Sequence, residues 1–284
     1  MADHDSPGDL HHLRRGAHGF LRRYAARAWV YQHGGERWEI TLPPDTAALP
    51  ENKRFKAHAR QEARRLAVAR LYDLDPEITA RAVHHSAAMR REWHDEAVAL
   101  AGHPAVAATL DIEPPAATGF LRWRDPGGIG YSPRGAPVIA CHWGPACDGR
   151  WLAWWADSHA LATGYAADAE GAAQQHLLST GFLPVFGPLW YDRQLLLRHG
   201  DGTASEHRDV PRAGPAAADA GRPAADPSSP VLALLYTTLA TWYLLTRPDA
   251  VQLSQQAAPA AGQAADRAAG LHPRPVTVAA ARRP

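Results

Sequence analysis

The chain has 284 residues, of which 46% are hydrophobic, so it is long enough to bury a sizeable core. Its 30 lysines and arginines nearly balance its 29 aspartates and glutamates, which excludes a global field that would draw the whole surface onto nucleic acid or a membrane, so such a partner must be met by a local patch. The two cysteines, Cys141 and Cys147, exclude a disulfide scaffold and lack the paired C-x-x-C units of a structural zinc site.

The N-terminal opening, MADHDSPGDLHHLRRG, is acidic and then rich in histidine, and it has no apolar run of the kind that a secretory signal needs. We therefore expect residues 1–16 to be disordered and the protein to be cytoplasmic. Further on, AWVYQHGGERWEIT (28–41) predicts a hairpin, because Gly34 and Gly35 supply the positive φ angles of a two-residue type I′ turn. We expect the face that carries its aromatic cross-strand pairs to pack on the core.

A helix with a basic side is predicted from about Asn52 to Leu71, NKRFKAHARQEARRLAVARL. At about 100° per residue, its apolar side carries Phe55, Ala59 and Leu66. The opposite side carries Lys53, Lys56, Arg60 and Arg64. These four cations are candidates for contacts with nucleic-acid phosphates, which position a protein without specifying a sequence. The alternative is a solvated helix face, and no helix-turn-helix, zinc-finger or aromatic RNA-binding motif decides between the two.

The middle of the chain is predicted to be sheet. The expected strands are GFLRWR (119–124), APVIACHW (136–143), RWLAWWA (150–156) and FLPVFGPLWYDRQLLL (182–197). Turn-rich segments separate the first three strands in the pattern of a β-meander. Helices are expected from Pro76 to near Gly102, over 158–163 and over 167–179.

The two central strands carry apolar residues on both faces. The loop between them has an even length and keeps side-chain parity, so Cys141 and Trp154 share one face while His142, Trp151 and Trp155 share the other. A sheet that is apolar on both faces is usually covered by helices on both faces, which would make His142 a hydrogen-bonded core residue. The alternative is a ligand pocket over His142, Trp151 and Trp155, because an apolar pocket with a few polar groups is a common binding site.

The motifs that could carry catalysis are weak. Asp157, Ser158 and His159 are consecutive, whereas a catalytic triad is assembled by folding, and no G-x-S-x-G elbow is present. Cys141 and His142 are neighbours in a strand and point to opposite faces, so they do not form a thiol and imidazole pair. These weak motifs favour a protein that is not an enzyme without deciding the question, and we expect it to hold no metal and no cofactor.

The C-terminal third contains one helix between segments of simple composition. Residues 199–229 are dense in Pro, Gly, Ala and Asp without an apolar period, which predicts a disordered linker. Ser229 and Pro230 then predict the start of a helix over 230–247. Its uncharged run raises the question of a membrane span, but its threonines and helical Ala, Thr and Leu spacing favour a buried helix. We expect residues 248–284 to be a low-complexity tail with a final strand.

Three segments, CHWGPACDGRWLAWWAD, LLYTTLATWYLL and RPVTVAAARRP, resemble a set of uncharacterised proteins of high-GC actinobacteria, some of which lie on mobile elements or phages. The shared pattern is a Trp-Gly then Asp-Gly hairpin, a Leu- and Thr-rich helix containing ATW, and a Val-rich end followed by Arg. Here Ala279 to Ala281 replace the more β-prone residues of such an ending. The resemblance covers about the last half of the chain, and it implies no activity.

Taken together, these patterns predict an α+β domain over 17–198, in which helices pack on a mostly antiparallel, tryptophan-rich sheet and the helix over 230–247 packs back on it. They do not identify an activity, and two functions of different classes remain. The first is a non-enzymatic binding or regulatory protein, an accessory to DNA transactions that meets nucleic acid through the basic helix. The second is a small-molecule enzyme or ligand-binding protein that uses the pocket over His142 and the tryptophans. Neither hypothesis involves a membrane, and the oligomeric state is left open.

Overall fold

The structure is a computed structural model, and it describes part of the chain. The described residues are 8–27, 51–92, 112–127, 129, 137–146, 149–157, 189–198 and 230–282. The hairpin predicted over 28–41, the helices predicted over 158–163 and 167–179, and the linker 199–229 lie outside these residues.

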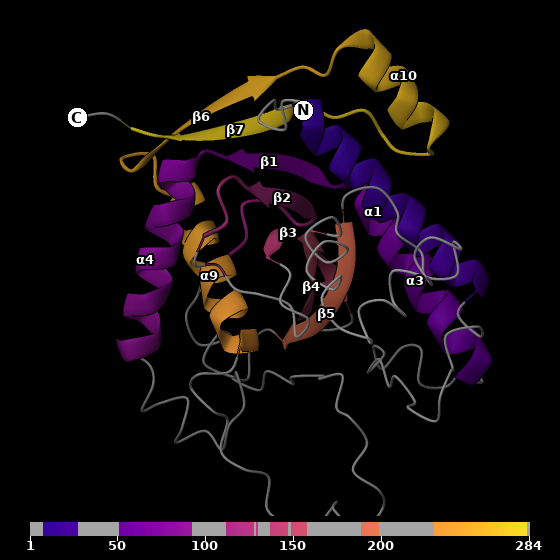
Figure 1. Ribbon diagram of the computed structural model, residues 1–284, viewed down its shortest axis with the longest axis horizontal. Helices are drawn as coiled ribbons and strands as arrows, with labels where there is room; N and C mark the ends of the chain where they lie inside the picture. The colour runs from indigo at the N-terminus through magenta and orange to yellow at the C-terminus, as the bar shows by residue number, and fades with distance from the viewer. Residues whose placement is uncertain are drawn as a thin grey trace, which may run out of the picture.

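The described elements build one seven-stranded sheet and the helices that cover it (Figure 1). In chain order they are α1 (Gly8–Arg27), α3 (Glu51–Val68), β1 (Arg70–Leu74), α4 (Pro76–Glu92), β2 (Gly119–Trp123), β3 (Val138–Ala146), β4 (Gly149–Asp157), β5 (Leu189–Arg198), α9 (Pro230–Leu245), β6 (Val251–Gln256), α10 (Ala260–Ala268) and β7 (Val276–Ala281). The strand order is β5-β4-β3-β2-β1-β7-β6. The α+β class is therefore as predicted.

The sheet is mixed, which corrects the expectation of a mostly antiparallel one. Strand β1 runs parallel to both of its neighbours, β2 and β7, whereas β2, β3 and β4 form the predicted antiparallel meander, which β5 extends by pairing antiparallel with β4. Parallel neighbours need a crossover connection, and α4 lies in the connection between β1 and β2. The sequence pattern missed β1 for two reasons. Leu71, Tyr72, Asp73 and Leu74 are all buried, so the strand does not alternate between buried and exposed side chains. The start of the strand also continues the helical spacing of apolar residues in α3.

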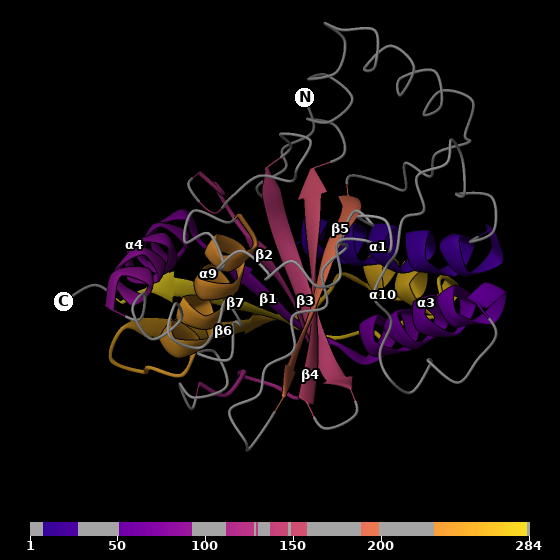
Figure 2. The same cartoon turned by 90° about the horizontal axis from the view of Figure 1, so that it is seen from below.

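Both faces of the central strands are covered, as the apolar residues on both faces predicted. Figure 2 shows α4 and α9 on one side of the strands and α1, α3 and α10 on the other. The pairing of Cys141 with Trp154 and of Ala140 with Trp155 gives the expected parity. A bulge between Val138 and Ala140 reverses it at the start of β3, so Val138 joins the core under α4 and α9.

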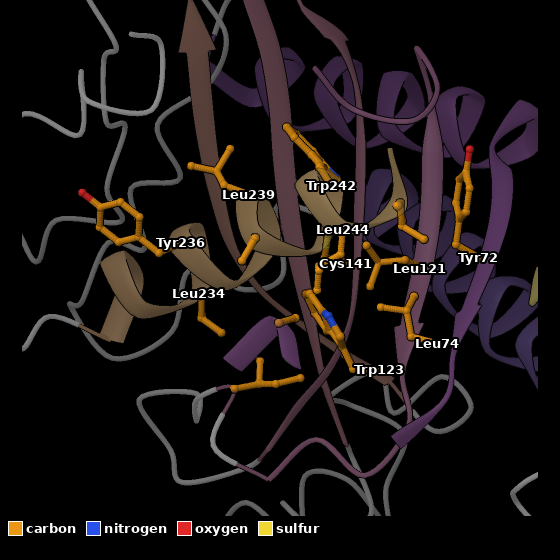
Figure 3. Packing of buried hydrophobic residues seen from close by; sticks show 14 of the residues in the cluster. Tyr72, Leu74, Leu121, Trp123, Cys141, Leu234, Tyr236, Leu239, Trp242 and Leu244 are labelled. Carbon is orange, nitrogen blue, oxygen red and sulfur yellow. The ribbon is translucent and has the colours of Figure 1, made fainter. Parts of the chain in front are cut away.

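The core between the sheet and the α4 and α9 pair is rich in tryptophan (Figure 3). Trp123 and Trp154 donate their indole N–H groups to the hydroxyls of Thr241 and Thr238, each at 3.0 Å. Thr238 also donates to the carbonyl of Leu234, one turn earlier in α9, at 2.8 Å. The threonines of α9 thus satisfy the indoles of Trp123 and Trp154, and the prediction of a buried core helix is confirmed. Among the described residues, no helix has the length and apolar character that crossing a membrane requires.

Two expectations about the ends of the chain are corrected. Within the region 1–16, expected to be disordered, residues 8–16 form the first half of α1, because Leu10, Leu13 and Ala17 form a buried stripe at helical spacing. The region 248–284, expected to be a low-complexity tail, forms β6, α10 and β7. Its alanine-rich run folds as α10, since alanine has the highest helix propensity, and the final strand forms in spite of its three alanines.

Candidate nucleic-acid interface

The four predicted basic residues lie together on the outer side of α3. Lys53, Lys56, Arg60 and Arg64 are all exposed, and their spacing of three or four residues keeps them on one stripe of the helix. At a rise of 1.5 Å per residue, the stripe is about 16 Å long. We call these four residues the basic stripe.

The inner side of α3 carries a buried ion pair that the sequence analysis missed. Glu62 and Arg65 are turned toward the sheet with the apolar side of the helix, and the Glu62 carboxylate accepts hydrogen bonds from Arg65 and His142. The Arg65 stem fits over β3 because position 144 is glycine, where a Cβ atom would lie only 2.7 Å from Arg65 Cδ. The signal in the sequence was the position of Glu62 at helical spacing from Ala59 and Leu66, on the apolar side.

The hydrogen bonds of His142 fix its tautomer. Trp155 Nε1, which can only donate, lies 3.0 Å from His142 Nδ1, so Nδ1 carries no proton. The proton is therefore on Nε2, which donates to Glu62. His142 is neutral in this arrangement, the charge of Glu62 is balanced by Arg65, and both imidazole nitrogens are occupied.

The structure brings together two of the three residues of the alternative ligand pocket and encloses them. His142 is 1% exposed and Trp155 is 0% exposed. Phe20 of α1 packs edge-on against Trp155, with ring centroids 5.9 Å apart. The side chain of Trp151 lies outside the described part. In this packing His142 and Trp155 stabilise the interior, and the ligand pocket stays a prediction.

A second buried carboxylate holds α10 against α1. Asp266 is the one buried residue of α10, and it accepts hydrogen bonds from His11 at 2.8 Å, Arg14 at 2.8 Å and Arg15 at 2.7 Å. Burial acts to raise the pKa of Asp266, but the hydrogen bonds from His11 and Arg15 and the charge of Arg14 together hold that pKa below its ordinary value. Asp266 is therefore ionised, and it neutralises part of the positive charge of α1.

Burial disfavours the charged forms of two basic residues of α1, Arg14 and His18. Arg14 is completely buried, and its Nε and Nη1 atoms have no hydrogen-bond partner. Burial lowers the pKa of Arg14 despite the opposing effect of Asp266. One turn further along, burial and the charges of Arg22 and Arg14 lower the pKa of His18 from 6.5 to about 4. His18 is therefore neutral at physiological pH.

The exposed charges that the structure describes in this helix layer are all positive. Among the described side chains of α1, α3 and α10, the two carboxylates, Glu62 and Asp266, are both fully buried. The exposed lysines and arginines are Arg22, Lys53, Lys56, Arg60, Arg64 and Arg267. On the other side of the sheet, by contrast, the exposed Glu77 of α4 forms an ion pair with Arg81. The layer of α1, α3 and α10 thus presents a basic surface although the chain as a whole is nearly neutral.

A third ion cluster joins the parallel strands. Arg122 of β2 binds Asp73 of β1 through two hydrogen bonds of 2.8 Å, and Arg124 binds the same carboxylate at 2.5 Å. Asp73 is fully buried. The carboxyl ends of parallel strands are a common place for ligands, but here both arginines are engaged by the carboxylate between them. We interpret the cluster as a link between β1 and β2.

The described residues offer little for metal or thiol chemistry. They contain no group of three His, Cys, Asp or Glu side chains that could hold a metal ion. Cys141 is buried, and burial raises the pKa of its thiol, which makes the thiolate scarce.

Comparisons of the chain with protein-family models, with curated proteins and with solved structures find no match. The interpretation of the site therefore depends on its own charges and contacts.

Proposed function

We propose that this protein is a non-enzymatic binding protein that associates with nucleic acid through the basic stripe of α3. The observation that carries the proposal is the asymmetry of charge in the layer of α1, α3 and α10. Among the side chains described in this layer, both carboxylates, Glu62 and Asp266, are buried and paired, while six lysines and arginines are exposed. A surface of this kind attracts a polyanion even when the net charge of the chain is only +1.

The chemistry of the stripe suits phosphates better than bases. Lysine and arginine that neutralise phosphates release condensed counterions, which gives an affinity that falls steeply with salt and depends little on sequence. The stripe contains no aromatic side chain for stacking and no asparagine or glutamine for reading base edges. We therefore expect binding with little sequence preference.

The same proposal covers the biological setting. An accessory to DNA transactions in the cytoplasm fits a backbone-binding protein, and it fits the resemblance to actinobacterial proteins of mobile elements. In this setting the protein positions or protects nucleic acid and performs no chemistry on it.

The proposal is tested by fluorescence anisotropy with labelled single- and double-stranded DNA and RNA at low salt. Reversal of the stripe, Lys53→Glu, Lys56→Glu, Arg60→Glu and Arg64→Glu, should abolish binding. The four side chains are exposed, so circular dichroism of the variant should match that of the wild type. If the wild type does not bind at low salt, or if the variant binds as well as the wild type, the proposal is wrong.

A charge-matched control uses cations on the other side of the molecule. Arg60→Glu with Arg64→Glu changes the net charge by the same amount as Arg247→Glu with Arg282→Glu, and all four residues are exposed. The first pair should weaken binding strongly, and the second should leave it nearly unchanged. Equal effects would assign binding to net charge and not to the stripe.

A further inference from the structure

Strand β6 is an open edge of the sheet. It pairs with β7 on one side and is the last strand in the order, so no described strand lies on its outer side (Figure 1). After Val251, its five residues Gln252–Gln256 are exposed on both faces. Charged side chains, prolines and bulges usually protect such an edge from pairing with another chain. Strand β6 has none of the three.

The hydrogen bonds around β6 show which backbone groups point outward. The Ala279 carbonyl of β7 accepts from Asp75 N in the direction of β1, so Ala279 and its partner Leu253 form a pair without mutual hydrogen bonds. In an antiparallel pair, hydrogen-bonded and non-hydrogen-bonded residue pairs alternate. In agreement with this alternation, Arg282 N donates to the Ala250 carbonyl, three positions along from the Leu253 and Ala279 pair. The N–H and C=O groups of Leu253 and Gln255 therefore point away from β7, toward the open edge.

We propose that β6 pairs with β6 of a second copy of this chain in an antiparallel arrangement centred on Ser254. In this register Leu253 of each copy lies opposite Gln255 of the other, and the outward groups of these two residues form four hydrogen bonds between the copies. A register centred on Leu253 would need the N–H of Val251, which already donates to the Arg247 carbonyl. The backbone thus favours the pairing centred on Ser254.

The chemistry of the edge suits a second copy. An uncharged strand meets its own copy without repulsion, and it gives no preference to a charged peptide. Leu253, whose side chain is 48% exposed, lies diagonally opposite Leu253 of the second copy on one face, where the two side chains reduce each other's exposure. No described helix packs on the exposed part of β6, and the side chains of Gln252–Gln256 are exposed on both faces.

The pairing has a consequence that rests on the proposed function. Two antiparallel strands of one sheet are related by a two-fold axis perpendicular to that sheet, so each face continues into the same face of the second copy. The basic stripes of both copies then lie on the same side of one continuous sheet. Two stripes on one side can bind one nucleic acid together, which raises the effective affinity of each.

The register is tested by cysteine cross-linking without nucleic acid, in a chain that carries Cys147→Ser. Ser254→Cys places two thiols opposite each other in a pair without hydrogen bonds, where Cα atoms are about 4.5 Å apart and a disulfide can form. Gln252→Cys is the matched control on the same strand, because Gln252 lies opposite Gln256 of the second copy. We expect oxidation to link Ser254→Cys into dimers and to leave Gln252→Cys monomeric. Equal cross-linking of the two variants, or none of Ser254→Cys, overturns the proposal.

Sedimentation velocity over a series of protein concentrations provides the second readout. One strand pair buries a small interface, so we expect reversible association, from 30.7 kDa at low concentration to twice that mass at high concentration. Leu253→Lys with Gln255→Lys should abolish the dimer through like-charge repulsion, whereas Val68→Lys, at the other exposed large apolar residue of the described chain, should keep it. A wild type that stays monomeric, or a dimer that survives the double variant, overturns the proposal. Neither result bears on whether the stripe binds nucleic acid.

Discussion

The two faces of the sheet are covered by helices of opposite character. Under α4 and α9 the core is apolar, and two of its indoles are paired with threonines of α9, as when Trp154 donates to Thr238. Under α1, α3 and α10, charged groups are buried with the apolar ones, with Glu62 and Asp266 at the centre of two networks. The difference shows how a nearly neutral chain acquires a basic surface: among the described side chains of this layer, the carboxylates are buried together with their basic partners, while the remaining lysines and arginines are exposed.

The largest effect is expected from Glu62→Gln, which removes the charge that balances Arg65. Loss of one partner of a buried ion pair costs about 3–5 kcal/mol of unfolding free energy, because the remaining charge is left uncompensated. The matched control is Glu77→Gln in the exposed pair with Arg81 on the other layer, where less than about 1 kcal/mol is expected. Urea denaturation measures both. Similar losses for the two variants would show that the buried network does not stabilise its layer.

A smaller and more local effect is expected from Asp266→Asn. The substitution removes the acceptor charge for Arg14 and Arg15, but α10 can move away and let water reach them, so we expect a loss of about 1–3 kcal/mol. Amide hydrogen exchange should accelerate in α10 and stay unchanged in α9. Arg267→Gln, an exposed substitution on α10, is the control and should leave exchange in α10 unchanged. If α10 keeps its protection in Asp266→Asn, the carboxylate does not hold it.

The charged layer should also respond to pH through His18. The pKa of His18 is lowered from 6.5 to about 4 in the folded protein, so between these values the unfolded chain binds a proton that the folded chain does not. Its contribution is therefore fully present above pH 6.5 and is lost as the pH falls toward about 4, by about 1–3 kcal/mol. His18→Gln should flatten the curve of unfolding free energy against pH in this window. His12→Gln, at an exposed position of the same helix, should not flatten it.

The apolar layer should respond to the loss of a single acceptor. Thr238→Val keeps the shape of the side chain but leaves the indole N–H of Trp154 buried without a partner, at a cost of about 1–2 kcal/mol. Thr246→Val at the exposed end of α9 should cost less than about 0.5 kcal/mol. Denaturant titration distinguishes the two. Equal small effects would mean that water or another group satisfies Trp154.

The fold was predictable where the sequence pattern is local. Strands β2, β3 and β4, and helices α4 and α9, lie within or close to their predicted ranges, because alternation, turns and caps are set by neighbouring residues. Strand β1 was missed because it is buried on both faces and pairs with strands that are distant in the chain. In the C-terminal region, simple composition predicted a tail, whereas the helix propensity of alanine and the pairing of β7 with β1 give ordered elements.

The candidate site was predictable in part for the same reason. The exposure of the four basic residues follows from the period of one helix. The partners of Glu62 and Asp266 do not, because His142 is 80 residues from Glu62, and His11 is 255 residues from Asp266. Only the fold could show that the described acids of this layer are buried with basic partners while its other described cations are exposed.

The most direct test of the basic stripe is the salt dependence of binding to duplex DNA. The wild type should show a linear fall of log Kobs with log salt concentration. Replacement of Lys53, Lys56, Arg60 and Arg64 by glutamine should reduce the slope by up to about 3–4, since each lost phosphate contact contributes about 0.9. The unfolding free energy should stay within about 0.5 kcal/mol of the wild type, because the substituted side chains are exposed. An unchanged slope in a folded variant would contradict the account.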